Sequence, residues 1–174
     1  MSSSEKSHNL SIIGSTEYVE IAGIKNIPAK VDTGADSSSI WASSINMQED
    51  GALTFCLFGQ KSPLYTGERL KTTDYTARVI RSSHGDEQIR YRVSLPVTIS
   101  SQTFKTTFTL ADRSRNNFPV LIGRRTIEGK YLVDVSKANV IRRSNPKTLN
   151  LNQELKADPY EFHQKYIKKE RSSE

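Results

Sequence analysis

Two short runs, far apart in the chain, limit what this sequence can fold into. The first is an apolar, β-branched segment that ends in Asp-Thr-Gly-Ala at residues 32–35. Its composition favours a strand. Gly34 is expected to supply the backbone freedom of a tight turn that aims the Asp32 carboxylate outward, and the Thr33 hydroxyl to brace that turn. The second run, Val-Leu-Ile-Gly-Arg at residues 120–124, also predicts a strand that ends at a glycine. Asp-Thr-Gly alone is typical of an ordinary turn, so the pair of runs is what indicates a site.

The composition fits one globular domain with polar ends. The chain has 174 residues, of which 35% are hydrophobic, enough for one compact core. Cys56 is the single cysteine, which excludes an internal disulfide and is compatible with a reducing compartment. No apolar run reaches the roughly 18 residues of a membrane span, and residues 1–9 lack the apolar core of a secretory signal. We therefore expect a cytoplasmic protein that does not enter the membrane.

The positive charge does not by itself indicate nucleic-acid binding. The formal net charge is +6, and residues 142–174 carry half of it, with eight Lys or Arg against five Asp or Glu. The rest of the chain contains no helix-turn-helix, zinc-finger or RNA-recognition pattern, so nucleic acid is not an expected partner. Basic groups raise the local concentration of any anionic ligand. A preference for acidic peptides is therefore equally compatible with this charge.

Periodicity predicts strands over almost the whole chain. Short alternating or β-branched segments between turn-forming residues are typical of strands. A longer pair of segments flanks residues 82–86 and predicts a projecting hairpin. The fold class that follows is all-β, a small closed barrel. The expected strands cover residues 17–21, 27–31, 53–58, 73–81, 88–99, 103–110, 131–135 and 138–141.

A few short helices are expected as well. Residues 37–45 and 124–128 each follow one of the two glycine runs, and each is expected to form a short helix or turn. From residue 145 a polar linker begins. Asp158 is a good N-cap and Pro159 suits the first helical position, so a short C-terminal helix should start there. The expected organisation is a flexible segment at 1–14, a barrel domain at 15–141, and a polar linker with a short C-terminal helix at 142–174.

These motifs resemble those of retropepsins, single-domain aspartic proteases whose monomer carries one Asp-Thr-Gly. The order of the two runs, with a hairpin near Gly85 between them, is the same. The chain resembles more closely a bacterial retropepsin-like branch labelled ATP-dependent zinc protease, which is associated with RimK-type ATP-grasp ligases. The resemblance covers about residues 15–141 and leaves both tails outside. The segments that carry the closer match are residues 110–114, 118–124 and 131–136.

The resemblance implies a catalytic dyad that two chains share. Two carboxylates a few ångströms apart hold one proton between them, so one acts as base toward water and the other as acid toward the peptide carbonyl. One chain supplies only Asp32, so the second carboxylate must be Asp32 of another subunit across a two-fold axis. The implied protein is a homodimeric aspartic endopeptidase, a hydrolase whose substrate is a peptide or protein.

The resemblance also implies supporting roles around the catalytic turn. Thr33 would brace the dyad, and Gly34 would let the two turns approach each other. The Gly-Arg pair that ends the second run would pack beneath the turn, and the acidic residue that follows the turn would position substrate or a neighbouring chain. The implied active-site support is Thr33, Gly34, Ala35, Asp36, Gly123 and Arg124.

The predicted hairpin would be the flap that covers the substrate cleft. Its tip is Ser83-His84-Gly85-Asp86. Retroviral flaps have a glycine-rich tip, and this chain departs from that pattern. The resemblance therefore implies a flap without implying how it closes.

The sequence contains no motif for binding zinc or ATP, although the branch is labelled ATP-dependent zinc protease. Zinc sites need ligands at characteristic spacings, whereas His8, His84, His163 and Cys56 are far apart in the chain. The glycine-rich nucleotide loops Gly-x-x-x-x-Gly-Lys-Ser/Thr and Gly-x-Gly-x-x-Gly are absent. We expect no metal and no cofactor, and an ATP requirement would belong to a partner.

Three functions stay open. The leading one is the homodimeric endopeptidase. The second is a non-proteolytic binding or regulatory module of the same fold, which works with a RimK-like ligase on acidic or glutamylated tails. The third is a hydrolase that trims acidic tails, which shares the peptidase mechanism and would show salt-dependent turnover. The Asp32→Asn substitution separates the first two, because it abolishes hydrolysis in one and leaves the biological effect unchanged in the other.

Overall fold

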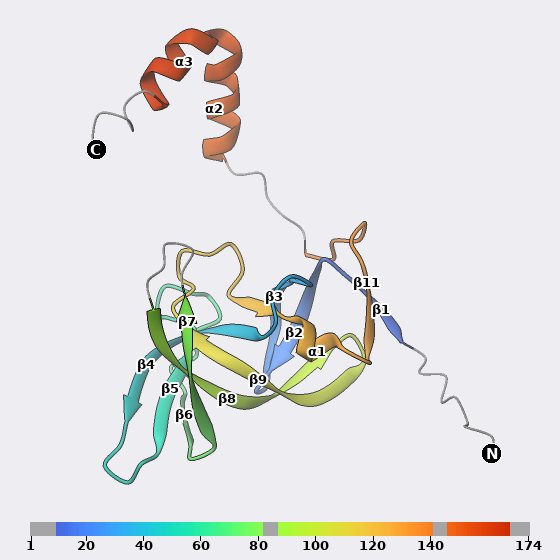
Figure 1. The fold of residues 1–174 in the computed structure, drawn as a ribbon, viewed down its shortest axis with the longest axis vertical. Coiled ribbons are helices and arrows are strands. Elements are labelled where there is room, and N and C mark those ends of the chain that lie inside the picture. Colours follow the sequence, from blue (N-terminus) through green and yellow to red (C-terminus); the bar gives the residue numbers. More distant parts are fainter. Residues whose placement is uncertain (1–9, 82–86, 141–145, 168–174) are drawn as a thin grey trace, which may run out of the picture. The chain divides into compact units, whose positions relative to one another are not determined.

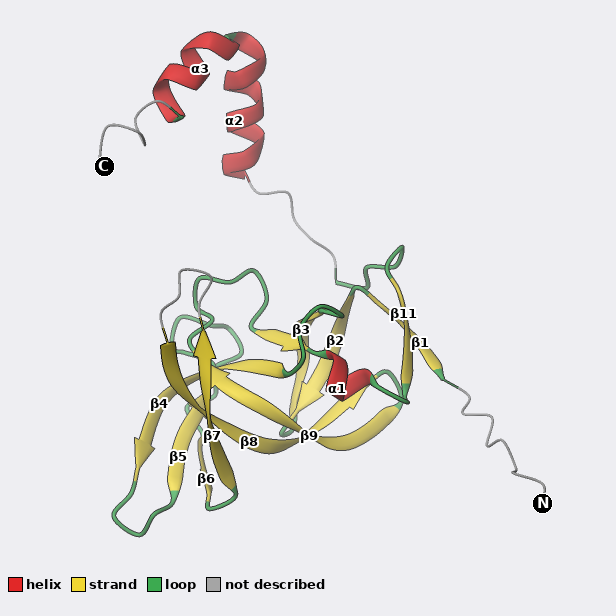
Figure 2. Ribbon diagram, viewed as in Figure 1, coloured by secondary structure: helices red, strands yellow, loops and turns green. Residues whose placement is uncertain are grey.

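The chain divides into two compact units, Met1–Val140 and Ile141–Glu174, and each is described by itself. The computed structural model describes residues 10–81, 87–140 and 146–167. Figure 1 follows the chain through its strands and helices, and Figure 2 shows that the first unit is built almost wholly of strands, whereas the second is helical. No helix in the described parts of the chain combines the length and apolarity that a bilayer crossing requires.

The predicted strands of the first unit are found, with ends shifted by a few residues, except for the last one. Residues 138–140 are irregular, and residue 141 lies outside the described residues. Val140 is buried, and its backbone N–H donates to Thr16 Oγ1 at 3.1 Å. The apolar residues that predicted a strand over 138–141 are therefore explained by burial without strand pairing. The strands are β1 (Ser11–Gly14), β2 (Thr16–Ile21), β3 (Ile24–Val31), β4 (Ser38–Met47), β5 (Leu53–Leu57), β6 (Arg69–Thr72), β7 (Tyr75–Arg81), β8 (Glu87–Ile99), β9 (Gln102–Ala111), β10 (Val120–Ile122) and β11 (Tyr131–Asp134), and the helix is α1 (Arg124–Ile127).

Six of these strands close into a barrel, as the sequence predicts. The hydrogen-bonded order β10-β3-β2-β8-β9-β4 returns to its start because β10 pairs with β3 on one side and β4 on the other. The pairing with β3 is parallel and the pairing with β4 antiparallel. Closure leaves these strands without an open edge between them. The barrel therefore holds β3 and β10, the strands that carry the two sequence runs, side by side.

Strand β4 corrects the expectation of a helix over residues 37–45. Its buried residues Ser38, Ile40 and Ala42 alternate with less buried ones, which is the period of a strand. The serines after the Asp turn resemble a helix N-terminus locally. Pairing with β5, β9 and β10 satisfies the backbone of this segment instead, and this long-range pairing overrides the local preference.

The barrel interior is filled by apolar side chains from every strand of the ring. Ile27 of β3 and Ile122 of β10 are fully buried. Burying one such side chain contributes about 1.5–3 kcal/mol relative to leaving it exposed. The two strands that lead into the candidate site are therefore anchored by the core. Further fully buried side chains are Ile21, Ile40, Phe58, Ile99 and Phe108.

The predicted hairpin is present as β7 and β8. These strands pair antiparallel from Tyr75–Val93 to Arg81–Glu87. The tip at residues 82–86, with the predicted flap residues Ser83, His84, Gly85 and Asp86, lies outside the described residues. The structure thus shows the two strands of the hairpin. The role of the four tip residues in a flap remains a prediction.

The second unit contains one helix more than the sequence indicates. Helix α3 (Pro159–Tyr166) begins as predicted, with Asp158 accepting a hydrogen bond from the Glu161 backbone N–H at 2.9 Å. The expectation of a polar linker is wrong over residues 146–157, which form helix α2 (Pro146–Ala157). Contacts with α3 explain the difference, because Lys165 Nζ and Tyr166 OH each donate to Glu154 Oε2 at 2.9 Å.

Candidate active site

The structure brings the two sequence runs into direct contact. Strands β3 and β10 run parallel, with Ile122 beside Val31. The backbone N–H of Asp32 donates to the carbonyl of Ile122 at 2.9 Å, and the N–H of Arg124 donates to the carbonyl of Ala35 at 2.8 Å. The Asp turn is therefore hydrogen-bonded to the Gly-Arg strand end at both of its ends.

The turn holds the Asp32 side chain by its own backbone. The N–H groups of Gly34 and Ala35 donate to Asp32 Oδ1 at 3.0 Å and 3.2 Å, and the N–H of Ala35 also lies 3.1 Å from the Asp32 carbonyl. This is the local bonding of an Asx turn. The described residues donate no hydrogen bond to the other oxygen, Oδ2. The carboxylate is thus oriented through one oxygen and keeps the other available.

Gly34 does not adopt a left-handed backbone, which corrects the expectation that it supplies special backbone freedom. Its φ does not lie in the left-handed region, where four other glycines of the described chain are found. A Cβ at Gly34 would lie 3.3 Å from Asp32 Oδ1. The missing side chain therefore leaves room beside the oriented carboxylate.

Thr33 lies at the exposed tip of the turn. Its hydroxyl makes no hydrogen bond with the described residues of its own chain, so the structure does not reproduce the bracing expected of it within one subunit. An exposed hydroxyl beside Asp32 is available to a second molecule.

Asp36 lies among three arginines. Arg125 Nε approaches its Oδ1 at 3.1 Å, Arg78 Nη1 its Oδ2 at 3.6 Å, and Arg124 Nη2 its Oδ1 at 3.8 Å. Desolvation raises the pKa of Asp36, but the hydrogen bond from Arg125 and the charges of the three guanidinium groups outweigh it and hold the pKa below its usual value. The sequence indicated Arg124; it missed Arg125, the next residue, and Arg78, which comes from β7.

The arginines around Asp36 should make part of the folding stability depend on acid pH. Because the pKa of Asp36 is lower in the folded state, its contribution is fully present above the unfolded pKa, about 3.8, and is lost as pH falls through the folded pKa. The stability difference between wild type and Asp36→Asn should therefore be the same at about pH 6 and pH 5 and shrink as the pH falls below about 4. Urea unfolding at several pH values measures it.

Asp74→Asn is the matched control for this experiment. It makes the same change at an exposed aspartate that forms no ion pair with the described residues. It measures what the loss of one aspartate charge does to stability where no arginine contacts the carboxylate. A stability difference for Asp36→Asn that follows that of Asp74→Asn at every pH would contradict the role assigned to the arginines.

A buried chain of hydroxyl groups supports the glycine of the second run. The N–H of Gly123 donates to Ser38 Oγ at 3.0 Å, and Ser38 Oγ lies 2.6 Å from Thr126 Oγ1. Thr126 in turn lies 3.0 Å from Thr106 Oγ1. A Cβ at Gly123 would lie 2.5 Å from the carbonyl carbon of Ser37, so only glycine fits this approach. The sequence reasoning missed Ser38 and Thr126, because their burial depends on β4 being a strand.

An open pocket lies beside the turn and contains three of the predicted residues, Thr33, Asp36 and Arg124. It connects the exposed face of the Asp turn with α1 and with the start of β11. Two of its side chains are arginines and two, Asp36 and Glu128, are carboxylates, so the formal charges of its lining balance. The other lining residues are Arg125, Ile127, Glu128 and Tyr131.

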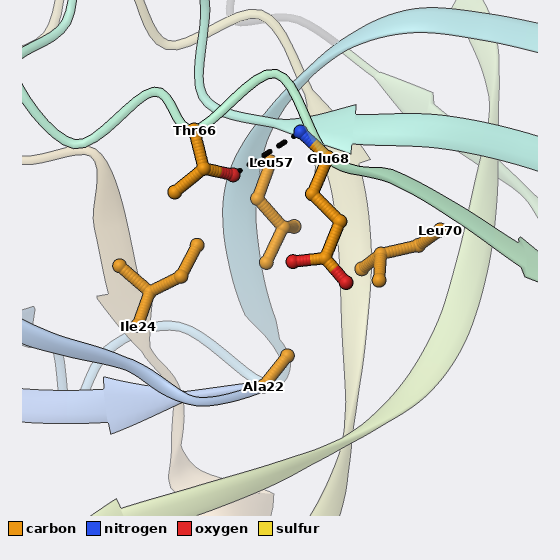
Figure 3. A pocket seen from close by; sticks show the side chains of 6 residues that line it. All are labelled: Ala22, Ile24, Leu57, Thr66, Glu68 and Leu70. Carbon is orange, nitrogen blue, oxygen red and sulfur yellow. Dashed lines mark hydrogen bonds between the residues drawn. The ribbon is translucent and has the colours of Figure 1, made fainter.

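A second, small pocket lies at the opposite end of β3 from Asp32. Figure 3 shows the Glu68 carboxylate among apolar side chains in this pocket, with the Glu68 N–H bonded to Thr66 Oγ1 at 3.2 Å. It contains none of the predicted site residues, and a β3 of eight residues spans about 25 Å. It is therefore separate from the candidate site. The lining residues are Ala22, Ile24, Leu57, Thr66, Glu68 and Leu70.

No group of three or more His, Cys, Asp or Glu side chains in the described ranges is placed to hold a metal ion. His8 and His84 lie outside those ranges. His163 belongs to α3, in the second unit, and Cys56 is a buried free thiol of β5. The described residues thus provide no set of side chains that could bind a metal ion.

A closed six-stranded barrel with one Asp-Thr-Gly turn, bonded to an Ile-Gly-Arg strand end, defines a retropepsin-like protein. The comparison with known families agrees. The chain belongs to the RimB-like family, described as retropepsin-like aspartic endopeptidase RimB, whose family model matches residues 12–144. The resemblance seen in the sequence is confirmed at the level of the family.

Longer proteins contain a related segment. A probable alpha-L-glutamate ligase from Desulfotalea psychrophila (strain LSv54 / DSM 12343) is 30% identical over 128 residues, which are 71% of this chain and 28% of that protein. One from Shewanella pealeana (strain ATCC 700345 / ANG-SQ1) is 30% identical over 137 residues, 76% of this chain and 30% of that protein. The chain thus spans less than a third of the length of these relatives.

A solved structure supports the fold. A protein of unknown function (DUF785) from Legionella pneumophila subsp. pneumophila str. Philadelphia 1 matches with a TM-score of 0.59 and 22% identity. The match covers 75% of this chain and 97% of the Legionella chain. At this identity the likeness shows the shared fold.

Proposed function

We propose that this chain is an aspartic endopeptidase that acts as a homodimer, with Asp32 of each subunit in the catalytic dyad. The observation that carries the proposal is the Asp32 carboxylate, which the turn orients through Oδ1 while Oδ2 receives no hydrogen bond from the described residues. The family of the chain supports the same reading. Thr33, Gly34, Ala35, Asp36, Gly123 and Arg124 would shape and brace the site.

The proposed chemistry needs both subunits. One Asp32 takes a proton from a water molecule, which attacks the peptide carbonyl, while the protonated partner donates to the carbonyl oxygen. Two carboxylates this close share a single proton, because ionising both is unfavourable. The exposed Thr33 would face its counterpart across the two-fold axis. The hairpin with Ser83, His84, Gly85 and Asp86 at its tip would cover the substrate.

Dilution tests whether the active species is a dimer. Peptidase activity per chain should fall as the protein is diluted through the concentration at which sedimentation shows dissociation. A crystal structure of the dimer should place the two Asp32 carboxylates within hydrogen-bond reach across a two-fold axis. Full activity of a monomer, or a dimer with the two aspartates far apart, would overturn the proposal.

A second candidate is a non-proteolytic module that works with a RimK-like ligase on acidic or glutamylated tails. It is favoured by one observation, the relatives named probable alpha-L-glutamate ligase, in which the related segment is less than a third of the protein. On either candidate we place the protein in the cytoplasm, because its one cysteine is a buried free thiol and such thiols are compatible with a reducing compartment.

A further inference from the structure

Strand β7 of the hairpin is attached to the barrel on one side only. It lies off the main path of the nine-stranded sheet and pairs with β8. No second strand in the described ranges pairs with β7, so its other edge is open. The base of the strand is fixed by Tyr75, whose hydroxyl donates to the Gly51 carbonyl at 2.8 Å and whose ring lies edge-on to Tyr91. Along the open edge, side chains must set where β7 stands relative to the rest of the barrel.

Arg78, in the middle of β7, reaches the segment that follows the Asp-Thr-Gly turn. Its Nη1 donates to Ser37 Oγ at 3.3 Å and lies 3.6 Å from Asp36 Oδ2. The side chains of Arg78 and Asp36 are 37% and 35% exposed, so this link is neither buried nor fully solvated. It joins the hairpin directly to the residues that come after the candidate catalytic turn.

Asp36 is a fixed anchor for this link. Its carbonyl accepts a hydrogen bond from the Arg125 N–H at 3.2 Å, and Arg125 Nε approaches its Oδ1 at 3.1 Å. Arg124 also faces Oδ1. Helix α1 therefore holds one oxygen of the carboxylate, while the other oxygen faces the hairpin. The carboxylate of Asp36 thus bridges α1 and β7.

Charge on the neighbouring strand directs Arg78 toward that anchor. Arg78 lies directly opposite Arg90 in the β7–β8 pairing, and like charges in such a pair are destabilising. Arg90 Nε donates to Gln88 Oε1 at 2.8 Å, which keeps the Arg90 side chain on its own strand. Asp36 supplies Arg78 with the opposite charge that Arg90 cannot.

We propose that Arg78 is a positioning residue, which holds the hairpin over the Asp32 turn by binding Asp36 and Ser37. The inference rests on the proposed function and adds what sets the place of the hairpin. Ion pairs that are partly exposed are weak, so this link biases the position of the hairpin without locking it. Without Arg78 the hairpin spends part of its time displaced from the turn, and a substrate must first return it. Arg78 thus acts on substrate binding through Asp36.

The kinetic test uses Arg78→Gln, which removes the charge. KM should rise by about two- to fivefold while kcat stays within about twofold, because a saturating substrate restores the position of the hairpin. Arg78→Lys, which keeps the charge, should restore most of the wild-type KM. The matched control is Arg90→Gln, the same change directly across the hairpin, which should leave KM within about 1.5-fold of the wild type. An equal rise for both variants overturns the proposal, since the effect would then be one of general charge.

A double-mutant cycle separates positioning from direct contact with the substrate. If Arg78 acts through Asp36, then Arg78→Gln should raise KM clearly less in an Asp36→Asn chain than in the wild type. Effects on KM that multiply fully in the double variant would mean that Arg78 binds the substrate itself, and they would overturn the proposal. A fall in kcat as large as the rise in KM would do the same, because a positioning residue of this kind acts before the substrate is bound.

Spin labels follow the hairpin without requiring any activity. One label is placed on β7 by Val79→Cys and the other directly after α1 by Glu128→Cys, both at exposed positions. Cys56 is 3% exposed and is therefore protected from labelling. Labelled chains are diluted with unlabelled protein, so that the distance within one chain is measured. The distance distribution should become broader or longer in Arg78→Gln and stay unchanged in Arg90→Gln. The same distribution in Arg78→Gln and the wild type contradicts the positioning role.

The two proposals fail in different ways. If the wild type hydrolyses no peptide and the label distances still change in Arg78→Gln, the endopeptidase is wrong and the positioning role stands. If hydrolysis is observed and neither KM nor the distances respond to Arg78→Gln, the positioning role is wrong and the endopeptidase stands. Thermal unfolding of each variant confirms that the barrel is intact before the variants are compared.

Discussion

Asp32→Asn is expected to abolish peptide hydrolysis while leaving the barrel and the dimer intact. The amide oxygen of Asn can still accept the hydrogen bonds from Gly34 and Ala35 that orient the side chain, so the turn keeps its shape. An amide cannot take the proton from water, and it cannot share a proton with the second Asp32. We expect kcat/KM to fall by about 10³-fold or more, measured on a fluorogenic peptide that the wild type cleaves.

The control for this experiment is Asp74→Asn, the same substitution at an exposed aspartate outside the candidate site. Its activity should match the wild type. Hydrolysis that survives Asp32→Asn would show that the dyad is not the catalyst. If the wild type hydrolyses nothing and Asp32→Asn leaves its effect on acidic tails unchanged in the cell, the non-proteolytic module working with a ligase becomes the better account.

Gly123→Ala is expected to be the most destabilising single substitution near the site. The new Cβ would lie 2.5 Å from the carbonyl carbon of Ser37 and 2.6 Å from its oxygen. Both are backbone atoms, which cannot swing aside as a flexible side chain can. To remove this steric overlap, β10 and the start of β4 would have to separate. That separation would also break the hydrogen bond from the Gly123 N–H to Ser38. We expect a loss of about 3 kcal/mol or more in the free energy of unfolding, measured with urea.

Gly51→Ala tests whether that loss comes from the close approach. Gly51 has a φ of +77°, and a Cβ there would meet nothing within 4 Å. Its only penalty is the left-handed backbone, about 1 kcal/mol. Gly123 itself has a φ of −89°, which alanine adopts without strain, so a loss for Gly123→Ala no larger than that for Gly51→Ala would contradict the contact with Ser37 as the cause of a large loss.

The strands could be predicted because their signals are local. Alternation and β-branched residues mark a strand within a few positions, as in residues 17–21 and 103–110, and Asp158-Pro159 marks a helix start in the same way. The Asp-Thr-Gly run and the Ile-Gly-Arg run were found for the same reason. The failures were segments whose state depends on distant partners. The serine-rich residues 37–45 became a strand by pairing with β9 and β10, and residues 146–157 became a helix that contacts α3.

The sequence by itself determined the fold class, the candidate catalytic residue Asp32 and the two runs that surround it. Each of these can be recognised from short stretches of consecutive residues. Only the tertiary structure decided what those residues touch. It placed Arg78 and Arg125 on Asp36, put Ser38 beneath Gly123, and set Arg78 opposite Arg90. These contacts join residues from different strands, and strand register follows from how the whole barrel packs its core. No short stretch of sequence contains that information.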